Sequence, residues 1–397
     1  MEMKKLPELC NITTGKLDAN AAVENGMYPY FTCGEIPSRI DEYAFDTDAI
    51  LLAGNNAQGN FHVSRYNGKF NAYQRTYVLT AKENCNLDYI YYSLKLALIQ
   101  LKNRSQGSQT KFLTMPILND ISINTSLNQL KIATVLSTLD NKIALNHRIN
   151  AKLEAMAKRL YDYWFVQFDY PDKNGKPYKT SGGKMVWNEV LKRKIPEGWE
   201  VKSINDISVS YRGVGYTAKD EKTEKDKNII LILRGNNISN NHIIYNGNTV
   251  YVDKSFVLKE QEIKKFDIII TMSSGSKEHV GKSAMFLFDS AHSYGAFCNK
   301  ITPNKECQYF LENYLHSESF IKYIRHSCSG TGINNLTNEH FDNAKFSFPT
   351  ESNLQLFNKK MKSIYDERAV VEKEIQKLTN LRGRLLPLLM NGQVVTN

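Results

Sequence analysis

Two short motifs in this sequence match patterns that bind cofactors or catalyse reactions in other proteins. The run GVGYTA (213–218) fits the glycine pattern of a dinucleotide-binding loop, but the charged run 219–227 follows where that fold needs an apolar helix start. The run SGSK (274–277) fits the S-x-x-K motif of acyl-transfer enzymes, yet the Ser-Asp-Asn and Lys-Thr-Gly motifs that accompany it do not follow. Both matches therefore predict ordinary loops.

Carboxylates and histidines, which hold metals and transfer protons in many active sites, do not cluster along the sequence. Asp172 and Glu200, with Lys202, could form a loose nuclease-like set, but Asp172 lies in a stretch rich in Gly, Pro and Lys rather than on a core strand. The eight histidines show no metal-ligand spacing, and there is no G-x-x-x-x-G-K-[ST] phosphate loop. The sequence therefore predicts no catalytic residues, no metal and no cofactor in this chain, which favours a binding or organising role.

A third group of candidates consists of amide, hydroxyl and basic side chains in polar loops that recur in both halves of the chain. Asn and Gln can pair bidentately with adenine, Arg with guanine, and Lys with phosphate. Each residue alone is better explained as a turn residue on a hydrated surface, but the recurring set predicts contacts with double-stranded DNA. The candidate DNA-binding residues are Lys16, Arg39, Asn55, Asn56, Gln58, Lys69, Gln74, Arg75 and Lys111 in the first half, and Arg234, Asn236, Asn237, Ser273, Ser274, Ser276, Lys277, Lys282, Asn334 and Asn335 in the second.

Two long helices must position these loops. Apolar residues alternate at intervals of four and three through 127–165 and again through 354–386, which is the pattern of helices packed along one another. We expect Pro387 to end the second helix. Asn146 and Arg368 interrupt the two apolar seams and either fix the register of a helix pair or face solvent or a partner. Two separate amphipathic helices, each covering its own domain, are the alternative.

The chain reads as two similar halves. In each half a buried strand, a polar loop, an amphipathic helix, a Gly/Thr loop and a long helix follow in the same order, and Leu113 and Thr114 recur as Leu336 and Thr337. Gly15 and Gly213 open the two halves. We therefore expect an α+β protein with an internal two-fold repeat. Its predicted parts are α/β domains at 1–126 and 201–350, long helices at 127–168 and 351–390, and a linker at 169–200.

Composition agrees with a DNA-binding protein that works in the cytoplasm. The 397 residues carry a net charge of +10, spread along the chain rather than concentrated in one basic arm. Six cysteines include no Cys-x-x-Cys pair, which indicates buried thiols in a reducing compartment. No apolar run is long enough to cross a membrane, and the first residues lack the apolar core of a secretory signal.

The stretches 131–169, 195–207 and 372–394 resemble the specificity (S) subunits of type I restriction–modification systems, and 15–34, 49–55 and 68–78 look like one class of their target-recognition domains. The resemblance implies two target-recognition domains joined by two long antiparallel helices, which together read a bipartite, asymmetric DNA site. It also implies that chemistry belongs to partners. Two modification (methyltransferase) subunits would bind S-adenosylmethionine and methylate adenine, and restriction (motor/nuclease) subunits would use ATP and Mg²⁺.

Two hypotheses from other classes compete with this interpretation. One is a single-chain nuclease or methyltransferase, which the absence of suitable motifs disfavours. The other is a coiled-coil scaffold whose globular ends bind protein or RNA rather than a specific DNA sequence.

Overall fold

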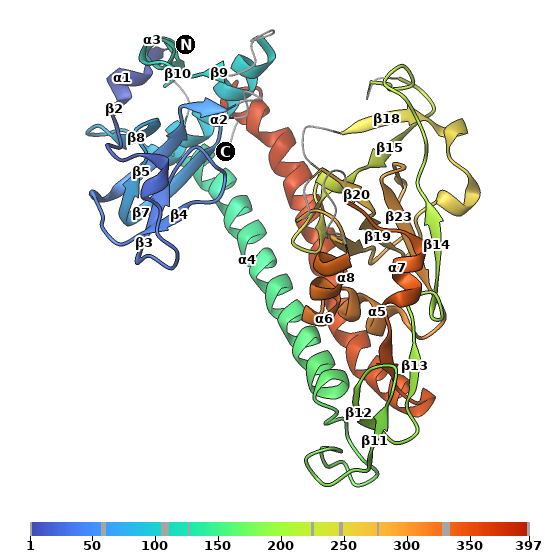
Figure 1. The fold of residues 1–397 in the computed structure, drawn as a ribbon. Coiled ribbons are helices and arrows are strands. Elements are labelled where there is room, and N and C mark those ends of the chain that lie inside the picture. The colour runs from blue at the N-terminus through green and yellow to red at the C-terminus, as the bar shows by residue number, and fades with distance from the viewer. Residues whose placement is uncertain are drawn as a thin grey trace. The chain divides into compact units, whose positions relative to one another are not determined.

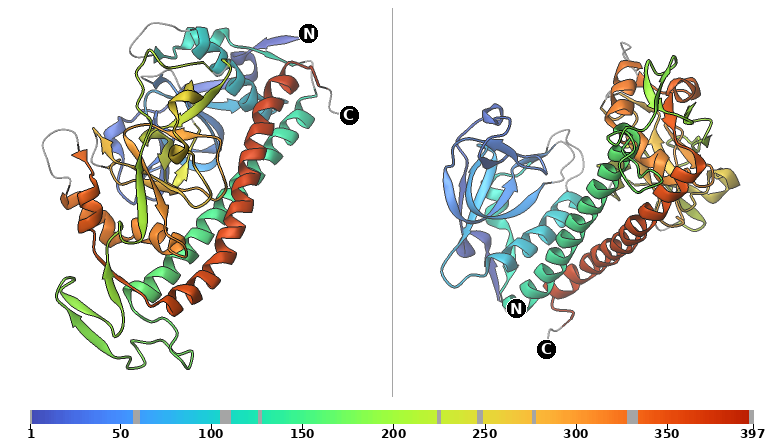
Figure 2. Two further views of the ribbon diagram at one scale, coloured as in Figure 1. Left: turned by 90° about the vertical axis from the view of Figure 1, so that its right-hand side faces the viewer. Right: turned by 90° about the horizontal axis from the view of Figure 1, so that it is seen from below.

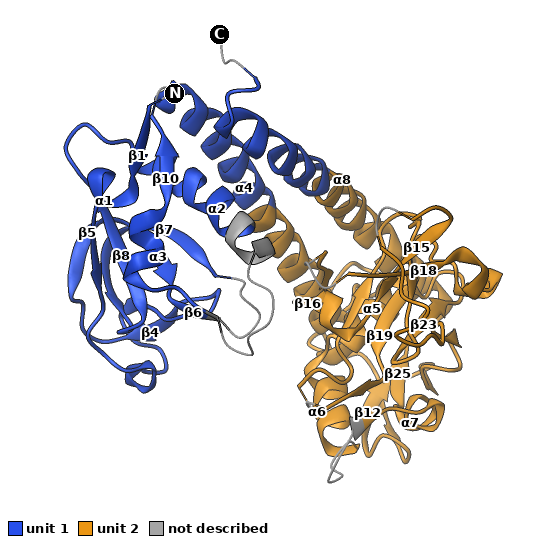
Figure 3. Cartoon of the chain, turned by 90° about the horizontal axis from the view of Figure 1, so that it is seen from above, with its two compact units in different colours: residues 1–146, 374–397 blue, residues 147–373 orange. Residues whose placement is uncertain are grey.

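A computed structural model describes residues 2–56, 61–104, 111–125, 128–223, 226–245, 249–275, 278–327 and 334–394 (Figure 1). The chain forms two compact units, which are residues 1–146 with 374–397 (unit 1) and residues 147–373 (unit 2) (Figure 3). Each unit combines an α/β domain with one stretch of each long helix. The α+β fold class expected from the sequence is confirmed.

A six-stranded sheet forms the centre of unit 1. All neighbouring strands are antiparallel except β3 and β7. In sheet order the strands are β2 (Cys10–Thr14), β8 (Thr76–Ala81), β5 (Phe45–Ala53), β7 (Val63–Ala72), β3 (Tyr28–Phe31) and β4 (Ser38–Ile40). In β5, Ile50 and Leu52 join one apolar cluster while Ala49 and Leu51 join another, because successive side chains of a strand point to opposite faces. The central strand is therefore buried on both sides.

The helices of unit 1 cover one face of this sheet. Leu94 and Leu98 pack with Ile50 and Leu52 in a cluster that also takes in residues of both long helices. The remaining elements of unit 1 are β1 (Met3–Lys5), α1 (Leu6–Leu9), η1 (Ala19–Ala21), β6 (Asn55–Asn56), α2 (Leu87–Arg104), β9 (Lys111–Phe112), α3 (Met115–Asp120) and β10 (Ser122–Asn124). The strands β1 and β10 pair with each other, as do β6 and β9.

Unit 2 repeats this plan with smaller sheets. A four-stranded antiparallel sheet has the order β14 (Ser208–Arg212), β23 (Cys298–Pro303), β19 (Ile268–Thr271) and β21 (Ser283–Met285), and a three-stranded sheet has the order β18 (Val250–Asp253), β15 (Ile229–Leu233) and β22 (Ser293–Tyr294). Ile268 and Ile270 of β19 belong to one core cluster and Ile269 to another. The strand β19 therefore has the same two-sided burial as β5.

Short strand pairs and helices complete unit 2. The pairs are β16 (Ile238–Ser239) with β17 (His242–Ile243), β20 (Ser273–Ser274) with β24 (Asn334–Asn335), and β13 (Glu200–Lys202) with β25 (Phe346–Phe348). The helices are η3 (Gly235–Asn237), η4 (Lys254–Phe256), η5 (Lys259–Gln261), α5 (Gln308–Leu315), α6 (Glu318–Ser327) and α7 (Asn338–Asn343).

The segment 169–200, for which composition predicted a linker, folds as part of unit 2. It contains the hairpin β11 (Met185–Asn188) and β12 (Arg193–Pro196). Tyr170, Ile195 and Trp199 are buried in the main core cluster, and the rings of Tyr170 and Trp199 stack with centroids 5.2 Å apart. The aromatic residues anchor the segment despite its Gly, Pro and Lys content.

The two long helices are α4 (Gln129–Tyr161), which continues into a π-helical turn η2 (Asp162–Val166), and α8 (Glu351–Met390). Within each unit their segments lie side by side and run in opposite directions (Figure 2). Ile132 and Leu136 lie in the core of unit 1, and Phe357 and Met361 lie in the core of unit 2. Met156, predicted to face the seam, is 52% exposed.

The prediction that Pro387 ends the second helix is wrong. The helix α8 continues through Pro387 to Met390. A proline in the last turn removes one helical hydrogen bond. Leu386, Leu389 and Met390 are buried in the unit 1 core, and this packing holds the turn in place.

Candidate nucleic-acid interface

Three backbone segments of unit 1 meet where the central strand β5 ends. The short strands β6 and β9 pair, and the N–H of Leu113 donates to the carbonyl of Gly54 at 2.8 Å. The N–H of Gly54 donates to the carbonyl of Arg75 at 2.8 Å, and Arg75 lies in the tight turn closed by Thr76 N–H and Tyr73 O at 2.8 Å. We call residues 54–56, 73–75 and 111–113 the unit 1 loop cluster.

The same three segments meet at the end of β19 in unit 2. The strands β20 and β24 pair, and the N–H of Leu336 donates to the carbonyl of Met272 at 2.7 Å. The N–H of Met272 donates to the carbonyl of Phe297 at 2.9 Å, in a turn closed by Cys298 N–H and Gly295 O at 2.8 Å. Residues 272–274, 295–297 and 334–336 form the unit 2 loop cluster.

The two loop clusters have the same backbone connections. Leu113 and Leu336, matched by the sequence repeat, make equivalent hydrogen bonds, so the predicted register is confirmed at this point. Gly15 and Gly213 also occupy equivalent places, because their N–H groups donate to the carbonyls of Thr76 at 3.3 Å and Cys298 at 3.1 Å, the residues that close the two turns. A Cβ atom would lie 1.8 Å from the carbonyl oxygen of Ala72 in the first case and 2.2 Å from that of Gly295 in the second. The first glycine of the pattern at 213–218, Gly213, therefore allows a close backbone crossing.

The exposed side chains of the unit 1 loop cluster are mainly polar and basic. Gln74 and Arg75 are exposed, and the guanidinium of Arg75 lies over the ring of Phe112 at 5.6 Å from its centroid. Lys16 is exposed beside the turn, because the neighbouring Leu17 carbonyl accepts the N–H of Gln74 at 2.9 Å. Stacking on an aromatic ring leaves the guanidinium edge available for bidentate hydrogen bonds.

The unit 2 loop cluster presents a different set. Phe297 at the turn tip is 70% exposed. Beside it is a hollow of about 640 Å³, lined among others by Ser210, Arg212, Asn299 and Asn335. Sequence reasoning identified Asn335 but missed Arg212, Asn299 and Phe297. Matching the turns YQR (73–75) and GAF (295–297) through the repeat was the one signal that could have found Phe297.

Four more predicted residues lie near the same end of β19, where the loop cluster begins. They are Arg234, just before η3, Asn236 and Asn237 in η3, and Lys282, just before β21. The N–H of Thr271 donates to the carbonyl of Lys282 at 2.9 Å, and Gly235 lies against the Thr271 side chain. Asn236 is exposed, whereas Asn237 is 1% exposed. Its amide donates to Ile244 O at 3.0 Å and accepts from Arg234 N–H at 3.0 Å, so Asn237 holds the turn that carries Arg234.

Other predicted residues lie elsewhere or outside the described parts. Arg39 lies on the edge strand β4, where it pairs with Pro29 of β3. Lys69 of β7 pairs with Asp46 near the start of β5, whereas the unit 1 loop cluster follows the end of β5. Arg39 and Lys69 are therefore not part of the unit 1 loop cluster. Gln58, Ser276 and Lys277 lie outside the described residues, and so do the side chains of Asn56, Lys111 and Asn334.

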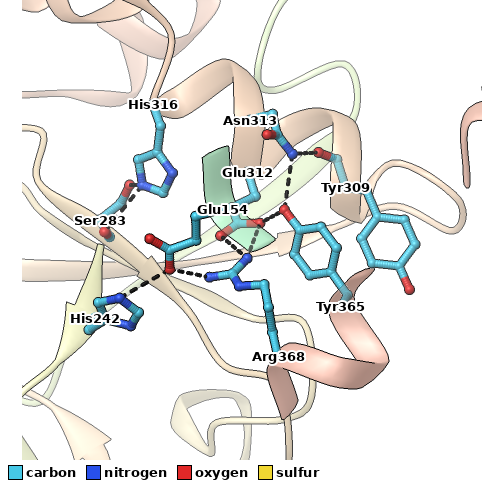
Figure 4. Close-up of polar contacts among 9 residues, drawn as sticks. All are labelled: Glu154, His242, Ser283, Tyr309, Glu312, Asn313, His316, Tyr365 and Arg368. Carbon is cyan, nitrogen blue, oxygen red and sulfur yellow. Dashed lines mark hydrogen bonds and ion pairs between the residues drawn. The ribbon is translucent and has the colours of Figure 1, made fainter. Parts of the chain in front are cut away.

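A buried ionic network joins the domain of unit 2 to its helix segments (Figure 4). The guanidinium of Arg368 on α8 lies 2.9 Å from Glu154 Oε1 on α4 and 3.3 Å from Glu312 Oε1 on α5. The hydroxyl of Tyr365 donates to Glu312, and His242 Nε2 of β17 lies 3.0 Å from Glu154 Oε1. Four separate elements therefore share one ionic network, in which Arg368 and Glu312 are buried and Glu154 and His242 are partly exposed.

The pKa values in this network follow from these contacts. Burial alone would raise the pKa of Glu154, but the hydrogen bond from His242 and the charge of Arg368 outweigh it and lower this pKa. The hydrogen bond to Glu154 raises the pKa of His242. Glu154 is therefore ionised at neutral pH, and its charge favours the protonated form of His242.

Unit 1 holds the other ends of the helices with a more exposed polar set. Arg382 on α8 pairs with Asp140 on α4 at 2.6 Å, and Tyr92 on α2 donates to Asp140 at 2.8 Å. Asn146, which interrupts the apolar seam, donates to Glu374 at 2.8 Å and is 1% exposed. Asn146 on α4 and Arg368 on α8 thus each make a polar contact with the other long helix.

Side chains that could act in catalysis have structural roles in the described part of the chain. Asp172 Oδ1 accepts the backbone N–H groups of Asn174 and Lys176, each at 2.8 Å, and so closes a turn. Burial raises the pKa of Cys10 and of Cys298 to about 12, so both thiols are protonated at neutral pH. Within the described ranges, no three His, Cys, Asp or Glu side chains gather to bind a metal ion. The described helices include none with the length and apolar character needed to span a membrane.

The comparison with protein families agrees with this architecture. The family described as "Type I restriction modification DNA specificity domain" matches residues 1–155 and 196–380. The chain belongs to this family.

Individual relatives are similar over shorter stretches. The specificity subunit of the type I restriction enzyme EcoDI from Escherichia coli is 40% identical over 158 residues, which cover 39% of this chain and 34% of the relative. The MjaIX specificity subunit of Methanocaldococcus jannaschii is 27% identical over 321 residues, 79% of this chain and 70% of the relative. The matches to EcoDI and to the StySPI subunit of Salmonella potsdam span only 34% and 45% of those proteins.

A solved structure shows the same fold. The crystal structure of the type I restriction–modification S subunit from M. genitalium aligns over 98% of this chain and 95% of its own, with a TM-score of 0.55 and 17% sequence identity.

Proposed function

We propose that this chain is the DNA-recognition subunit of a type I restriction–modification complex. The observation that carries the proposal is the pair of loop clusters, which share one backbone framework and present different side chains. The framework fixes the loops by hydrogen bonds between backbone groups, and the exposed side chains include amides and guanidinium groups that suit base edges. Each unit would read one half of a bipartite, asymmetric site in a major groove.

Chemistry would be supplied by partner subunits. Two modification subunits would carry S-adenosylmethionine and methylate adenine, and restriction subunits would use ATP and Mg²⁺ to move along and cut unmodified DNA. The buried thiols and turn-forming carboxylates support a non-catalytic role for this chain. The exposed apolar residues Leu145 and Met156 on α4, and Val370 and Leu381 on α8, support docking of modification subunits along the helices. Such a complex would work in the cytoplasm, where it meets DNA.

The proposed function assigns a role to each part of the chain. We propose residues 1–126 and 201–350 as the two target-recognition domains and 127–168 and 351–390 as the helices that set the unread spacer between half-sites. Residues 169–200 would join the first helix to the second domain.

The test combines binding with mapping of the modified base. The chain is purified with its modification subunits, supplied with S-adenosylmethionine and random-sequence duplex DNA, and N6-methyladenine is located by sequencing. We expect one bipartite motif, and tighter binding of that duplex than of a scrambled one in a gel-shift assay. Equal binding of scrambled DNA or of duplex RNA would contradict the proposal. Methyl transfer by this chain alone would contradict its non-catalytic role.

A further inference from the structure

The tip of the 295–298 turn in unit 2 combines a fixed backbone with an exposed aromatic ring. The N–H of Gly295 donates to Leu233 O at 2.8 Å, and the carbonyl of Phe297 accepts N–H groups of both Met272 at 2.9 Å and Ser273 at 3.2 Å. Tyr294, just before the turn, is fully buried. The 70% exposure of the Phe297 ring is therefore a property of a well-anchored turn, not of a loose loop.

The surroundings of Phe297 distinguish it from other exposed apolar residues, which are common on protein surfaces. Phe297 is one of the residues that line the hollow, together with Ser210, Arg212 and Asn299. The amide of Asn299 donates to Ser210 Oγ at 2.9 Å, which fixes its orientation. The hollow thus has mixed walls, with Met272, Ala296 and Leu336 beside these hydrogen-bonding side chains, and Phe297 adds an exposed ring to its apolar part, as expected of a surface that meets a ligand with both polar and apolar features.

The equivalent position in unit 1 has the opposite chemistry. Arg75 occupies the same place in its turn, since the carbonyls of Arg75 and Phe297 accept equivalent hydrogen bonds from Gly54 and Met272. The guanidinium of Arg75 suits the two acceptors of guanine. A phenyl ring can make no such bond. The apolar group that a base edge presents in the major groove is the C5-methyl of thymine.

We propose that Phe297 is a specificity-determining residue that packs on the C5-methyl group of a thymine in the half-site read by unit 2. The proposal rests on the DNA-recognition function proposed above. It predicts that this half-site contains a thymine at a position where cytosine, adenine and guanine are each rejected.

The test removes the methyl group from DNA without touching the protein. Each thymine of the unit 2 half-site is replaced in turn by deoxyuridine, which keeps the base-pairing edge and lacks the methyl. Binding is measured by fluorescence anisotropy with the complete complex. We expect one replacement to weaken binding about threefold to tenfold, as for loss of one buried methyl contact, and replacements in the other half-site to have no such dependence on Phe297.

Protein variants test whether the loss of binding on removal of the thymine methyl depends on the Phe297 side chain. Phe297→Ala should bind the thymine duplex with the same loss and should no longer distinguish thymine from uracil at that position, while Phe297→Leu should keep part of the preference. Phe256→Ala removes another exposed phenylalanine of unit 2, on η4 outside the loop cluster, and should leave the preference unchanged. Circular dichroism and thermal unfolding check that each variant folds.

The outcomes separate this inference from the function on which it rests. Specific binding that ignores every thymine-to-uracil change in this half-site overturns the role of Phe297 and leaves DNA recognition intact. An equal loss by Phe297→Ala on all sequences, with uracil discrimination kept, indicates a non-specific wedge or backbone contact and also overturns it. Failure of the unmodified complex to prefer any duplex refutes DNA recognition itself.

Discussion

The two units hold the same pair of helices with charges of very different burial. In unit 1 the Arg382–Asp140 pair is part-exposed, with side chains 33% and 24% accessible, and it lies beside an apolar cluster. In unit 2 the side chains of Arg368 and Glu312 are 5% and 3% accessible. An exposed pair contributes little to stability, whereas removal of one partner of a buried pair leaves an unpaired charge in the core. The comparison indicates that removal of one charged partner should destabilise unit 2 more than unit 1.

The two loop clusters share a framework of backbone hydrogen bonds but present different side chains at the surface. Three backbone hydrogen bonds of one cluster have direct counterparts in the other, while Gln74 and Arg75 in unit 1 correspond to Ala296 and Phe297 in unit 2. The main-chain hydrogen bonds that connect the loops are thus distinct from the outward-facing side chains that we propose for recognition.

The largest expected effect is on stability, from Arg368→Ala. Loss of the guanidinium leaves Glu312, whose side chain is 3% accessible, without its cation in the core, and should lower the free energy of unfolding by about 3–5 kcal/mol. Denaturant unfolding followed by circular dichroism measures it. The matched variant Arg382→Ala in unit 1 should cost about 1 kcal/mol or less. Similar losses for the two variants would remove the contrast between the units.

Gly15→Ala and Gly213→Ala test the shared framework. Each added methyl would overlap a backbone carbonyl, so we expect a loss of about 1–3 kcal/mol in unfolding free energy in both cases. Gly215→Ala is the control, because a Cβ atom there meets nothing within 4 Å. If Gly15→Ala were tolerated while Gly213→Ala was not, the crossings would differ in the two units.

Arg75→Ala sharpens the contrast between the loop surfaces. A lost bidentate contact to guanine should weaken binding of the specific duplex by about 1–3 kcal/mol and relax one position of the half-site read by unit 1. Sequencing of methylated sites and anisotropy with single-base variants measure both effects. Relaxation in the other half-site, or a uniform loss on all sequences with a reduced salt dependence, would assign Arg75 to a different role.

The smallest effect concerns pH. His242 faces Glu154, with Glu372, Arg368 and His147 also close enough to influence its charge. Its folded-state pKa is raised, so its charge contributes stability below the unfolded pKa of about 6.5, and this contribution is lost as the pH rises through the folded pKa. His242→Gln should therefore destabilise the protein more at pH 5.5 than at pH 8.5. In a Glu154→Gln background that difference should disappear. A constant difference across this range would mean that His242 acts without its charge.

The sequence predicted the features that repeat along the chain. Helical periodicity located α4 and α8, and the offset between Leu113 and Leu336 located the equivalent loops. What it missed depends on tertiary context. Asn237 has the composition of a solvated loop residue but closes a turn inside the domain, and Trp199 lies in a Gly- and Lys-rich stretch but joins the core. Phe297 was missed because an apolar residue gives no sign, in sequence, of standing exposed beside polar groups.

The backbone origin of the loop framework has a consequence for how such a protein changes over generations. Because main-chain groups rather than side chains tie 54–56 to 73–75, and 272–274 to 295–297, codons for the outward-facing residues can drift with little effect on folding. Under the proposed function, a single nucleotide change in the gene would then alter one letter of the DNA sequence that the complex recognises. New DNA targets would arise from a fold that remains intact at every step, while the glycines at the crossings stay under constant selection.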